Sequence, residues 1–108
     1  NIFMLGMAYK QDINDVRESP ALDVFKHLQK HGAVLKYNDP YIPDFKLNGK
    51  KHTSVELTEK ALQEADLVVI TTMHSKYDYH FVQKHAKFIF DTKNAMKNIG
   101  DRDNIEVL

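Results

Sequence analysis

Ile2-Phe3-Met4-Leu5-Gly6 is a nearly continuous apolar run close to the start of the chain, and it ends at a glycine. A short run of this kind is typical of a strand that is buried on both faces, as in a parallel sheet. Ser19-Pro20 then predicts a helix start, because serine caps the first amides and proline suits the first helical position. Gly32 predicts the helix end, and an apolar strand follows over residues 33–37. Strand, helix and strand in this order predict one right-handed parallel unit.

The rest of the chain continues the alternation of helix and strand. Apolar spacing predicts helices over residues 58–64 and 77–85 and strands over residues 67–71 and 88–90, with the strand at 67–71 in the centre of the sheet. Residues 105–108 fit either one more edge strand or a frayed tail. We therefore expect a single α/β domain with a Rossmann-like, doubly wound, mostly parallel sheet.

Two details of packing also follow from the pattern. The apolar stripe of the first helix consists of Ala21, Val24, Phe25 and Leu28, which we expect to face the sheet. Residues 44–53 are polar and contain the turn signal Asn48-Gly49, so we expect an excursion whose Phe45 and Leu47 fold back onto the domain.

Composition excludes several classes of function. The chain has 108 residues, with 15 basic and 15 acidic side chains, so its formal net charge of zero gives no reason to expect nucleic acid or an anionic membrane as partner. It has no cysteine, which excludes a disulfide, a thiolate metal site and a cysteine nucleophile within these residues. The longest apolar runs are too short to span a bilayer and no secretory signal opens the chain, so we expect a cytoplasmic protein. Because the chain starts at Asn1 inside an apolar stretch, we expect a piece of a longer protein.

The loop after the first strand is the first candidate site. In open parallel sheets, ligands bind beyond the carboxyl ends of the strands, and a loop from residue 9 to 18 is longer than is usual there. Lys10 suits a phosphate, Arg17 can clamp a phosphate or carboxylate in a bidentate fork, and the helix after Ser19 offers free amides and a positive dipole end. The alternative is a solvated loop that is tied by its own ion pairs, with Arg17 held by Asp15.

Two further strand ends lie on the same predicted edge. Asp91-Thr92-Lys93-Asn94 follows the fourth strand, where Lys93 adds a second positive charge, although a strand stop and a turn explain the tetrapeptide equally well. Thr71-Thr72-Met73-His74 follows the third strand and can line a pocket. We interpret His74 as a bystander and assign it no catalytic role.

A metal site and a dinucleotide site are not predicted. His27 and His31 stand four residues apart on the first helix, but no carboxylate or third ligand has a defined spacing, so we predict no metal. Only four glycines are present, and no G-x-G-x-x-G can be written. The chain is therefore not expected to bind its own dinucleotide.

Several motifs together resemble one known family. Leu5-Gly6-Met7-Ala8-Tyr9-Lys10, continued by Asp15-Val16-Arg17-Glu18-Ser19-Pro20-Ala21, resembles the opening of the C-terminal, UDP-binding domain of the UDP-glucose/GDP-mannose dehydrogenase family. Residues 32–43, 65–69 and 90–94 resemble later motifs of that domain, including its D-P-Y-x-P corner. The similarity runs over about residues 1–98, and residues 99–108 form a tail or an edge strand.

The resemblance implies an activity that we do not expect from this chain alone. Members of the family oxidise the C6 hydroxyl of a nucleotide sugar to a carboxylate in two NAD-dependent steps through a cysteine thiohemiacetal and thioester. By this resemblance, we expect the NAD-binding domain and that cysteine to lie upstream, and residues 1–108 to be the UDP-sugar-binding domain of a larger dehydrogenase that holds no catalytic residue and is inactive alone.

The resemblance also implies roles for four residues. Tyr9 and Lys10 match positions that contact UDP, and Arg17 matches a position near the cofactor across the interdomain cleft. Lys93 stands where the family has arginine, which keeps the charge and loses the planar fork.

The resemblance leaves a choice between related and unrelated functions. The Ser19-Pro20 and D-P-Y-x-P motifs look more like bacterial enzymes that act on UDP-N-acetylhexosamines for capsule or surface polysaccharide precursors. A GDP-mannose 6-dehydrogenase domain is the first alternative. A flavodoxin-like regulatory module, with Asp12 and Asp15 as a metal or phospho-acceptor site, is the second. Complete enzymes of the family are dimers or larger, whereas this piece is expected to be a monomer.

Overall fold

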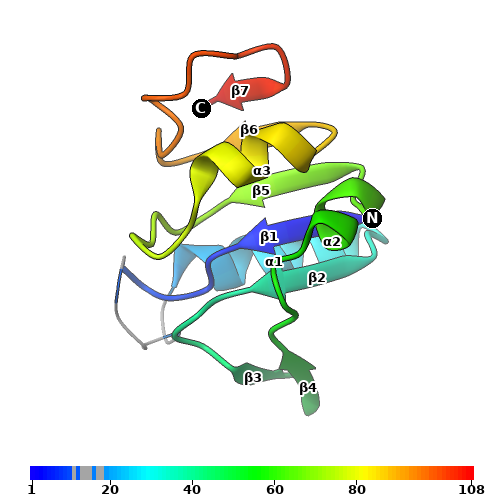
Figure 1. The fold of residues 1–108 in the computed structure, drawn as a ribbon. Helices are drawn as coiled ribbons and strands as arrows, with labels where there is room; N and C mark the ends of the chain where they lie inside the picture. Colours follow the sequence, from blue (N-terminus) through cyan, green and yellow to red (C-terminus); the bar gives the residue numbers. More distant parts are fainter. Residues whose placement is uncertain (11, 13–15, 17–18) are drawn as a thin grey trace.

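A five-stranded parallel sheet forms the centre of the protein in the computed structural model, which describes residues 1–10, 12, 16 and 19–108. The strands lie in the order β2-β1-β5-β6-β7, with every neighbouring pair parallel, and a separate antiparallel hairpin contains β3 and β4 (Figure 1). The elements in chain order are β1 Ile2–Leu5, α1 Pro20–Lys30, β2 Leu35–Asn38, β3 Asp44–Leu47, β4 Lys50–Thr53, α2 Glu59–Glu64, β5 Leu67–Ile70, α3 Tyr79–His85, β6 Ile89–Asp91 and β7 Ile105–Val107.

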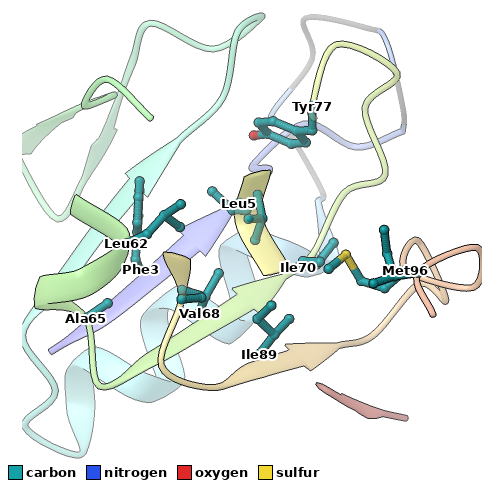
Figure 2. Close-up of a cluster of buried hydrophobic side chains, with 12 residues drawn as sticks. Phe3, Leu5, Leu62, Ala65, Val68, Ile70, Tyr77, Ile89 and Met96 are labelled. Carbon is teal, nitrogen blue, oxygen red and sulfur yellow. The ribbon is translucent and has the colours of Figure 1, made fainter. Parts of the chain in front are cut away.

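Helices cover both faces of the sheet, which confirms the predicted doubly wound architecture. Figure 1 shows α1 behind the sheet and α2 and α3 in front of it. On the α2 and α3 side, Phe3, Val68 and Ile89 of the sheet form one buried cluster with Leu62 of α2 (Figure 2). Val82 of α3 belongs to the same cluster, and all five residues are nearly inaccessible to solvent. A buried cluster on each face explains why the strand residues are apolar without alternation.

The second buried cluster lies between the sheet, α1 and the hairpin. Phe25 of α1 makes an edge-on aromatic contact with Phe45 of β3, at 5.3 Å between ring centroids, and Tyr37 of β2 lies 5.1 Å from the same ring. The turn between the hairpin strands is made by Asn48 and Gly49, with φ of 51° and 79°. Positive φ at both positions is typical of the tight turns that suit the twist of a hairpin. The predicted excursion and its return to the core are confirmed.

Three expectations about elements need correction. Val24 is 37% exposed, because α1 packs through Ala21 and Phe25 and turns Val24 toward solvent. Phe88 is 41% exposed and precedes β6, since the register of the sheet pairs Ile89 with Val68 and carries the strand on to Asp91.

The third correction concerns α3, which begins two residues later than predicted. Asp78 caps the helix by accepting a hydrogen bond from the amide of Phe81, so Tyr77 lies outside it. The Tyr77 hydroxyl instead donates to the carbonyl of Asn38 at 2.7 Å. At the other end of the chain, residues 105–107 form an edge strand next to β6, which decides between the two predicted alternatives.

Candidate functional site

An open pocket lies beyond the carboxyl ends of β1, β5 and β6. The carboxyl ends of these strands point to the left in Figure 1. The pocket has a volume of about 340 Å³. It is lined by Tyr9, Lys10, Thr71, Thr72, Met73 and Lys93. Three segments that are far apart in the sequence therefore meet at the predicted edge of the sheet, as expected for an α/β ligand site.

Tyr9 and Lys10 are the first exposed residues after β1. Met7 and Ala8 immediately before them are buried, whereas Tyr9 is 46% exposed. The Lys10 ammonium lies 5.7 Å from the centre of the Tyr9 ring, within the range of a cation–π contact. Both side chains are thus presented at the pocket from a backbone that is anchored in the core.

Gly6 brings this backbone close to the loop after β5. Its φ is +103°, and a Cβ at this position would lie 2.3 Å from the Thr72 Cβ and 2.6 Å from the Thr72 amide nitrogen. Only glycine fits both the conformation and the space. The Thr72 hydroxyl donates to the Ala8 carbonyl at 3.0 Å, and the Thr71 hydroxyl donates to the carbonyls of Leu5 and Gly6. The threonines therefore hold the first turn instead of facing a ligand with free hydroxyl hydrogens.

Asp39 fixes the same turn from the end of β2. This residue is 2% exposed, and its Oδ2 accepts hydrogen bonds from the amides of Met7 at 2.7 Å and Ala8 at 2.9 Å, while Oδ1 accepts from Tyr41. Burial by itself raises the pKa of Asp39, but the hydrogen bond to His74 and those from the backbone amides outweigh it and lower the pKa below its usual value. The carboxylate is therefore a buried anchor for the loop.

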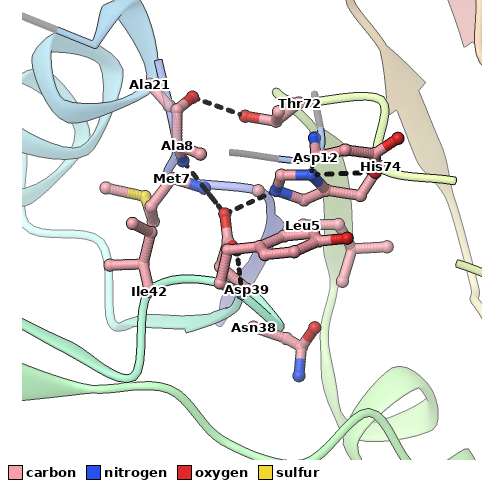
Figure 3. Close-up of polar contacts among 12 residues, drawn as sticks. Leu5, Met7, Ala8, Asp12, Ala21, Asn38, Asp39, Ile42, Thr72 and His74 are labelled. Carbon is pink, nitrogen blue, oxygen red and sulfur yellow. Dashed lines mark hydrogen bonds and ion pairs between the residues drawn. The ribbon is translucent and has the colours of Figure 1, made fainter. Parts of the chain in front are cut away.

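His74 connects Asp39 to the far side of the loop. Its ring is completely buried, its Nε2 lies 2.8 Å from Asp39 Oδ2, and its Nδ1 accepts a hydrogen bond of 2.8 Å from the amide of Asp12 (Figure 3). Asp12 in turn accepts bonds from the amide and hydroxyl of Ser75, which lower the pKa of its carboxyl group. His74 does not line the pocket, and these bonds give it a structural role, since they link two segments next to the pocket.

Lys93 reaches the pocket from the end of β6. Its amide donates to Asp91 Oδ1 at 3.0 Å, and Asp91 is fully buried and also accepts from the amides of Ala95 and Met96. The end of β6 and the position of Lys93 are therefore linked, because Asp91 is the last residue of the strand and its carboxylate fixes the backbone of Lys93. Lys93 and Lys10 line the same pocket, as predicted from the shared edge.

The N-terminus of α1 offers fewer free amides than predicted. Pro20 has no N–H, the amide of Ala21 donates to the Ser19 hydroxyl, and that of Leu22 donates to the Ser19 carbonyl. The Ser19 hydroxyl itself donates to the Ala8 carbonyl at 3.2 Å. Ser19 therefore ties the helix start to the loop and uses the amides that were expected to meet an anion.

The geometry favours an anionic ligand. Lys10 and Lys93 line one open pocket from two strand ends, and the carboxylates at the ends of β2 and β6, Asp39 and Asp91, are buried and bonded to backbone amides. Among residues 1–10, 12, 16 and 19–108, no cluster of three or more histidine, aspartate or glutamate side chains could hold a metal ion. A smaller hollow of about 110 Å³ lies at the opposite end of the strands, and neither Lys10 nor Lys93 lines it.

Some predicted positions cannot be placed. Asp15 and Arg17 lie outside the described residues, so the expected ion pair and the expected cofactor contact remain predictions. In the part of the chain that the structure describes, no helix is long and apolar enough to cross a membrane.

Sequence reasoning missed the pairing of Asp39 with His74. The sequence indicates Asp39 as part of a strand-ending corner and His74 as a residue after a strand, and neither pattern predicts a bond between them. Both follow strands that flank β1, so the shared edge was a usable signal for their proximity, although burial of both side chains was not visible in the spacing.

Comparison with known proteins agrees with the fold and the motifs. The model of the UDP-glucose/GDP-mannose dehydrogenase family, UDP binding domain, matches residues 3–98. A UDP-N-acetyl-D-mannosamine dehydrogenase of Campylobacter jejuni is 38% identical over 80 residues, which cover 70% of this chain and 19% of that protein. One of Methanocaldococcus jannaschii is 30% identical, with 98% of this chain and 26% of that protein covered.

A solved structure shows the same arrangement of elements. The UDP-N-acetyl-mannosamine dehydrogenase Cap5O from S. aureus superposes with a TM-score of 0.73 at 28% identity, over 98% of this chain and 25% of that one. The chain thus spans about a fifth to a quarter of the length of these relatives. With a family match over most of its length and the expected fold, the chain belongs to the UDP-glucose/GDP-mannose dehydrogenase family and corresponds to its UDP binding domain.

Proposed function

We propose that this domain binds the uridine diphosphate half of a UDP-sugar in an NAD-dependent 6-dehydrogenase that oxidises the C6 hydroxyl to a carboxylate. The observation that carries the proposal is the meeting of Lys10 and Lys93 at one open pocket. A diphosphate carries negative charge on both phosphoryl groups, and two mobile ammonium groups on different loops can neutralise both. Tyr9 beside Lys10 offers an aromatic face and a hydroxyl to the nucleoside.

The cofactor is proposed to bind elsewhere in the complete enzyme. In this chain the amides of Met7 and Ala8, which follow the first strand, already donate to Asp39 and do not face a ligand. A dinucleotide needs such amides, in a glycine-rich turn, for its pyrophosphate, so the first turn does not fit NAD. We therefore assign NAD binding, with its role as hydride acceptor, to residues outside this chain, and keep Arg17 as the proposed contact to the cofactor across the domain boundary.

The proposed sugar is an N-acetylhexosamine. Support comes from the relatives of C. jejuni and M. jannaschii, which are named UDP-N-acetyl-D-mannosamine dehydrogenases. The product would be a uronic acid nucleotide for capsule or surface polysaccharide. We further propose a cytoplasmic enzyme that is a dimer or larger when complete.

Calorimetric titration with UDP tests the proposal on the protein and on its Lys10→Ala variant. We expect measurable binding by the wild type and a loss of about tenfold or more in the variant, because a hydrogen bond to a charged group is worth about 1.5–3 kcal/mol. Lys26→Ala is the matched control, since Lys26 is an exposed lysine on α1 away from the pocket. Equal affinity of Lys10→Ala and wild type contradicts the proposal.

Two further titrations distinguish the alternatives. Tighter binding of GDP than of UDP would indicate a GDP-mannose enzyme. Heat from Mg²⁺ without any heat from UDP would indicate a regulatory module instead of a nucleotide-binding domain.

A further inference from the structure

His74 is a buried histidine close to the pocket, and each of its two ring nitrogens makes a hydrogen bond. One bond is to Asp39, which holds the backbone before the exposed residues Tyr9 and Lys10, and the other is to the amide of Asp12, which follows them. We propose that His74 is the positioning residue that holds Tyr9 and Lys10 in place for the diphosphate. The proposal rests on the function proposed above and adds to it a residue that touches no ligand. Figure 3 shows the imidazole between Asp39 on one side and Asp12 on the other.

The first end of the segment is held through Asp39. Nε2 of His74 lies 2.8 Å from Asp39 Oδ2, and the same oxygen accepts the amides of Met7 and Ala8. These amides immediately precede Tyr9. The histidine thus orients the carboxylate that fixes the backbone on the N-terminal side of the exposed pair.

The second end is held directly by the ring. Nδ1 of His74 accepts the amide hydrogen of Asp12, whose φ is 60°. Because Nδ1 accepts, the ring proton of the neutral imidazole is on Nε2 and is donated to Asp39. Both bonds therefore require the same neutral tautomer, and the Asp12 carboxylate adds a second tie to this loop through Ser75.

The ring is itself held on every side. Its centroid lies 4.9 Å from that of Tyr41 and 5.7 Å from that of Tyr77, and the Tyr79 hydroxyl donates to the His74 carbonyl at 3.0 Å. A side chain that is buried, packed and hydrogen-bonded in this way can fix the positions of its partners. The imidazole thus binds the amide of residue 12 directly and contacts the carboxylate that holds the amides of residues 7 and 8, and the exposed residues Tyr9 and Lys10 lie between them.

This arrangement lowers the ordering cost of ligand binding. A lysine on an unanchored loop must lose backbone freedom when it meets a phosphate, and that loss reduces the affinity. The amides of Met7 and Ala8 donate to Asp39, whereas the amide of Asp12 donates to the His74 ring itself, so we expect the second end to depend most on His74.

Three substitutions separate the two bonds. In His74→Asn the amide oxygen can occupy the place of Nδ1 and accept from Asp12, whereas in His74→Gln the amide nitrogen can reach the place of Nε2 and donate to Asp39. His74→Phe keeps the aromatic packing and makes neither bond. Val82→Ala is the matched control, because Val82 is fully buried in the core cluster under α3 and makes none of the bonds to Asp39 or Asp12, so its truncation lowers stability and leaves these bonds in place.

We expect His74→Phe and His74→Gln to weaken UDP binding about tenfold in calorimetric titration, and His74→Asn and Val82→Ala to stay within about threefold of wild type. Amide hydrogen exchange gives a readout that needs no ligand. The Asp12 amide should exchange slowly in wild type, His74→Asn and Val82→Ala, and rapidly in the other two variants.

The outcomes distinguish this inference from the proposed function. Unchanged UDP affinity in His74→Phe, with binding lost in Lys10→Ala, overturns the role of His74 and leaves the function standing. Equal exchange of the Asp12 amide in wild type and His74→Phe also overturns it. Absence of UDP binding by the wild type overturns the proposed function, and the positioning of Lys10 for a diphosphate fails with it even if the exchange results are as expected.

Discussion

At the scale of single residues, Gly6 has the strictest requirement in the loop. A Cβ there would meet both the side chain and the backbone of Thr72, and the positive φ adds strain for any other residue. We expect Gly6→Ala to lower the free energy of unfolding by about 3 kcal/mol, from strain and overpacking together. Gly100→Ala is the control, because a Cβ at that position meets nothing within 4 Å. Urea unfolding measures both variants, and equal losses would contradict the steric argument.

At Lys93 a substitution can be designed that is expected to strengthen UDP binding. Lysine contacts a phosphate as a point charge, whereas arginine can bind two oxygens through its planar fork. Lys93→Arg should therefore tighten UDP binding by about three- to tenfold, a gain of about 1 kcal/mol. Lys97→Arg, at an exposed position outside the pocket lining, serves as control in the same titration. Unchanged affinity in Lys93→Arg would show that residue 93 does not contact the phosphates.

Residues at strand ends could be predicted better than residues that support them. Tyr9, Lys10 and Lys93 were identified as candidates because parallel strands bring their carboxyl ends to one edge. The bond between Asp39 and His74 joins residues that are 35 positions apart, and neither local spacing nor propensity reports such a pairing. Residues that position a site are found only once the topology is known.

At the scale of elements, the hairpin carries a half-buried histidine in an aromatic cluster. The ring of His52 stacks on Phe45 at 5.2 Å and meets Phe25 edge-on at 4.9 Å, and its Nε2 is buried without a partner among the described residues. Burial lowers the pKa of His52 below 6.5, and the nearby charge of Lys50 lowers it further. The folded state therefore favours the neutral ring.

The sign of the pH effect on the hairpin follows from this shift. Below pH 6.5 the unfolded chain binds a proton on His52 that the folded chain resists, so the stabilisation is complete above pH 6.5 and is lost as the pH falls through the lower folded value. The free energy of unfolding of wild type should thus decrease more between pH 7 and pH 5 than that of His52→Phe. Parallel pH profiles of the two proteins, measured by urea unfolding, would show that His52 is not responsible.

The presence of the helices and strands could be predicted from the sequence better than the residues at which they begin and end. The strand at residues 67–70, the helix cap at Ser19 and the hairpin turn at Asn48 were predictable, because local propensity and tertiary packing agree there. The exposed Val24 and Phe88 broke the pattern, since their places depend on how α1 and β6 are turned against the sheet. Packing between elements decides such details, and it is not encoded in the period of one helix or strand.

At the scale of the whole molecule, ligand binding and folding are linked. A ligand that binds only the folded state adds about 2.7 kcal/mol of stability when its free concentration is 100 times its dissociation constant. For a domain of about 100 residues, each kcal/mol raises Tm by about 4–8 °C, so UDP at that concentration should raise Tm by roughly 10–20 °C. Calorimetry of the protein with increasing UDP measures the shift, and uridine at equal concentration, which lacks the diphosphate, should give a much smaller one.

Lys10→Ala should lose most of the UDP shift while its Tm without ligand stays close to that of wild type, since Lys10 is exposed and its backbone is fixed from Met7, Ala8 and Asp12. Equal shifts with UDP and uridine would show that the phosphates make no contact with the lysines.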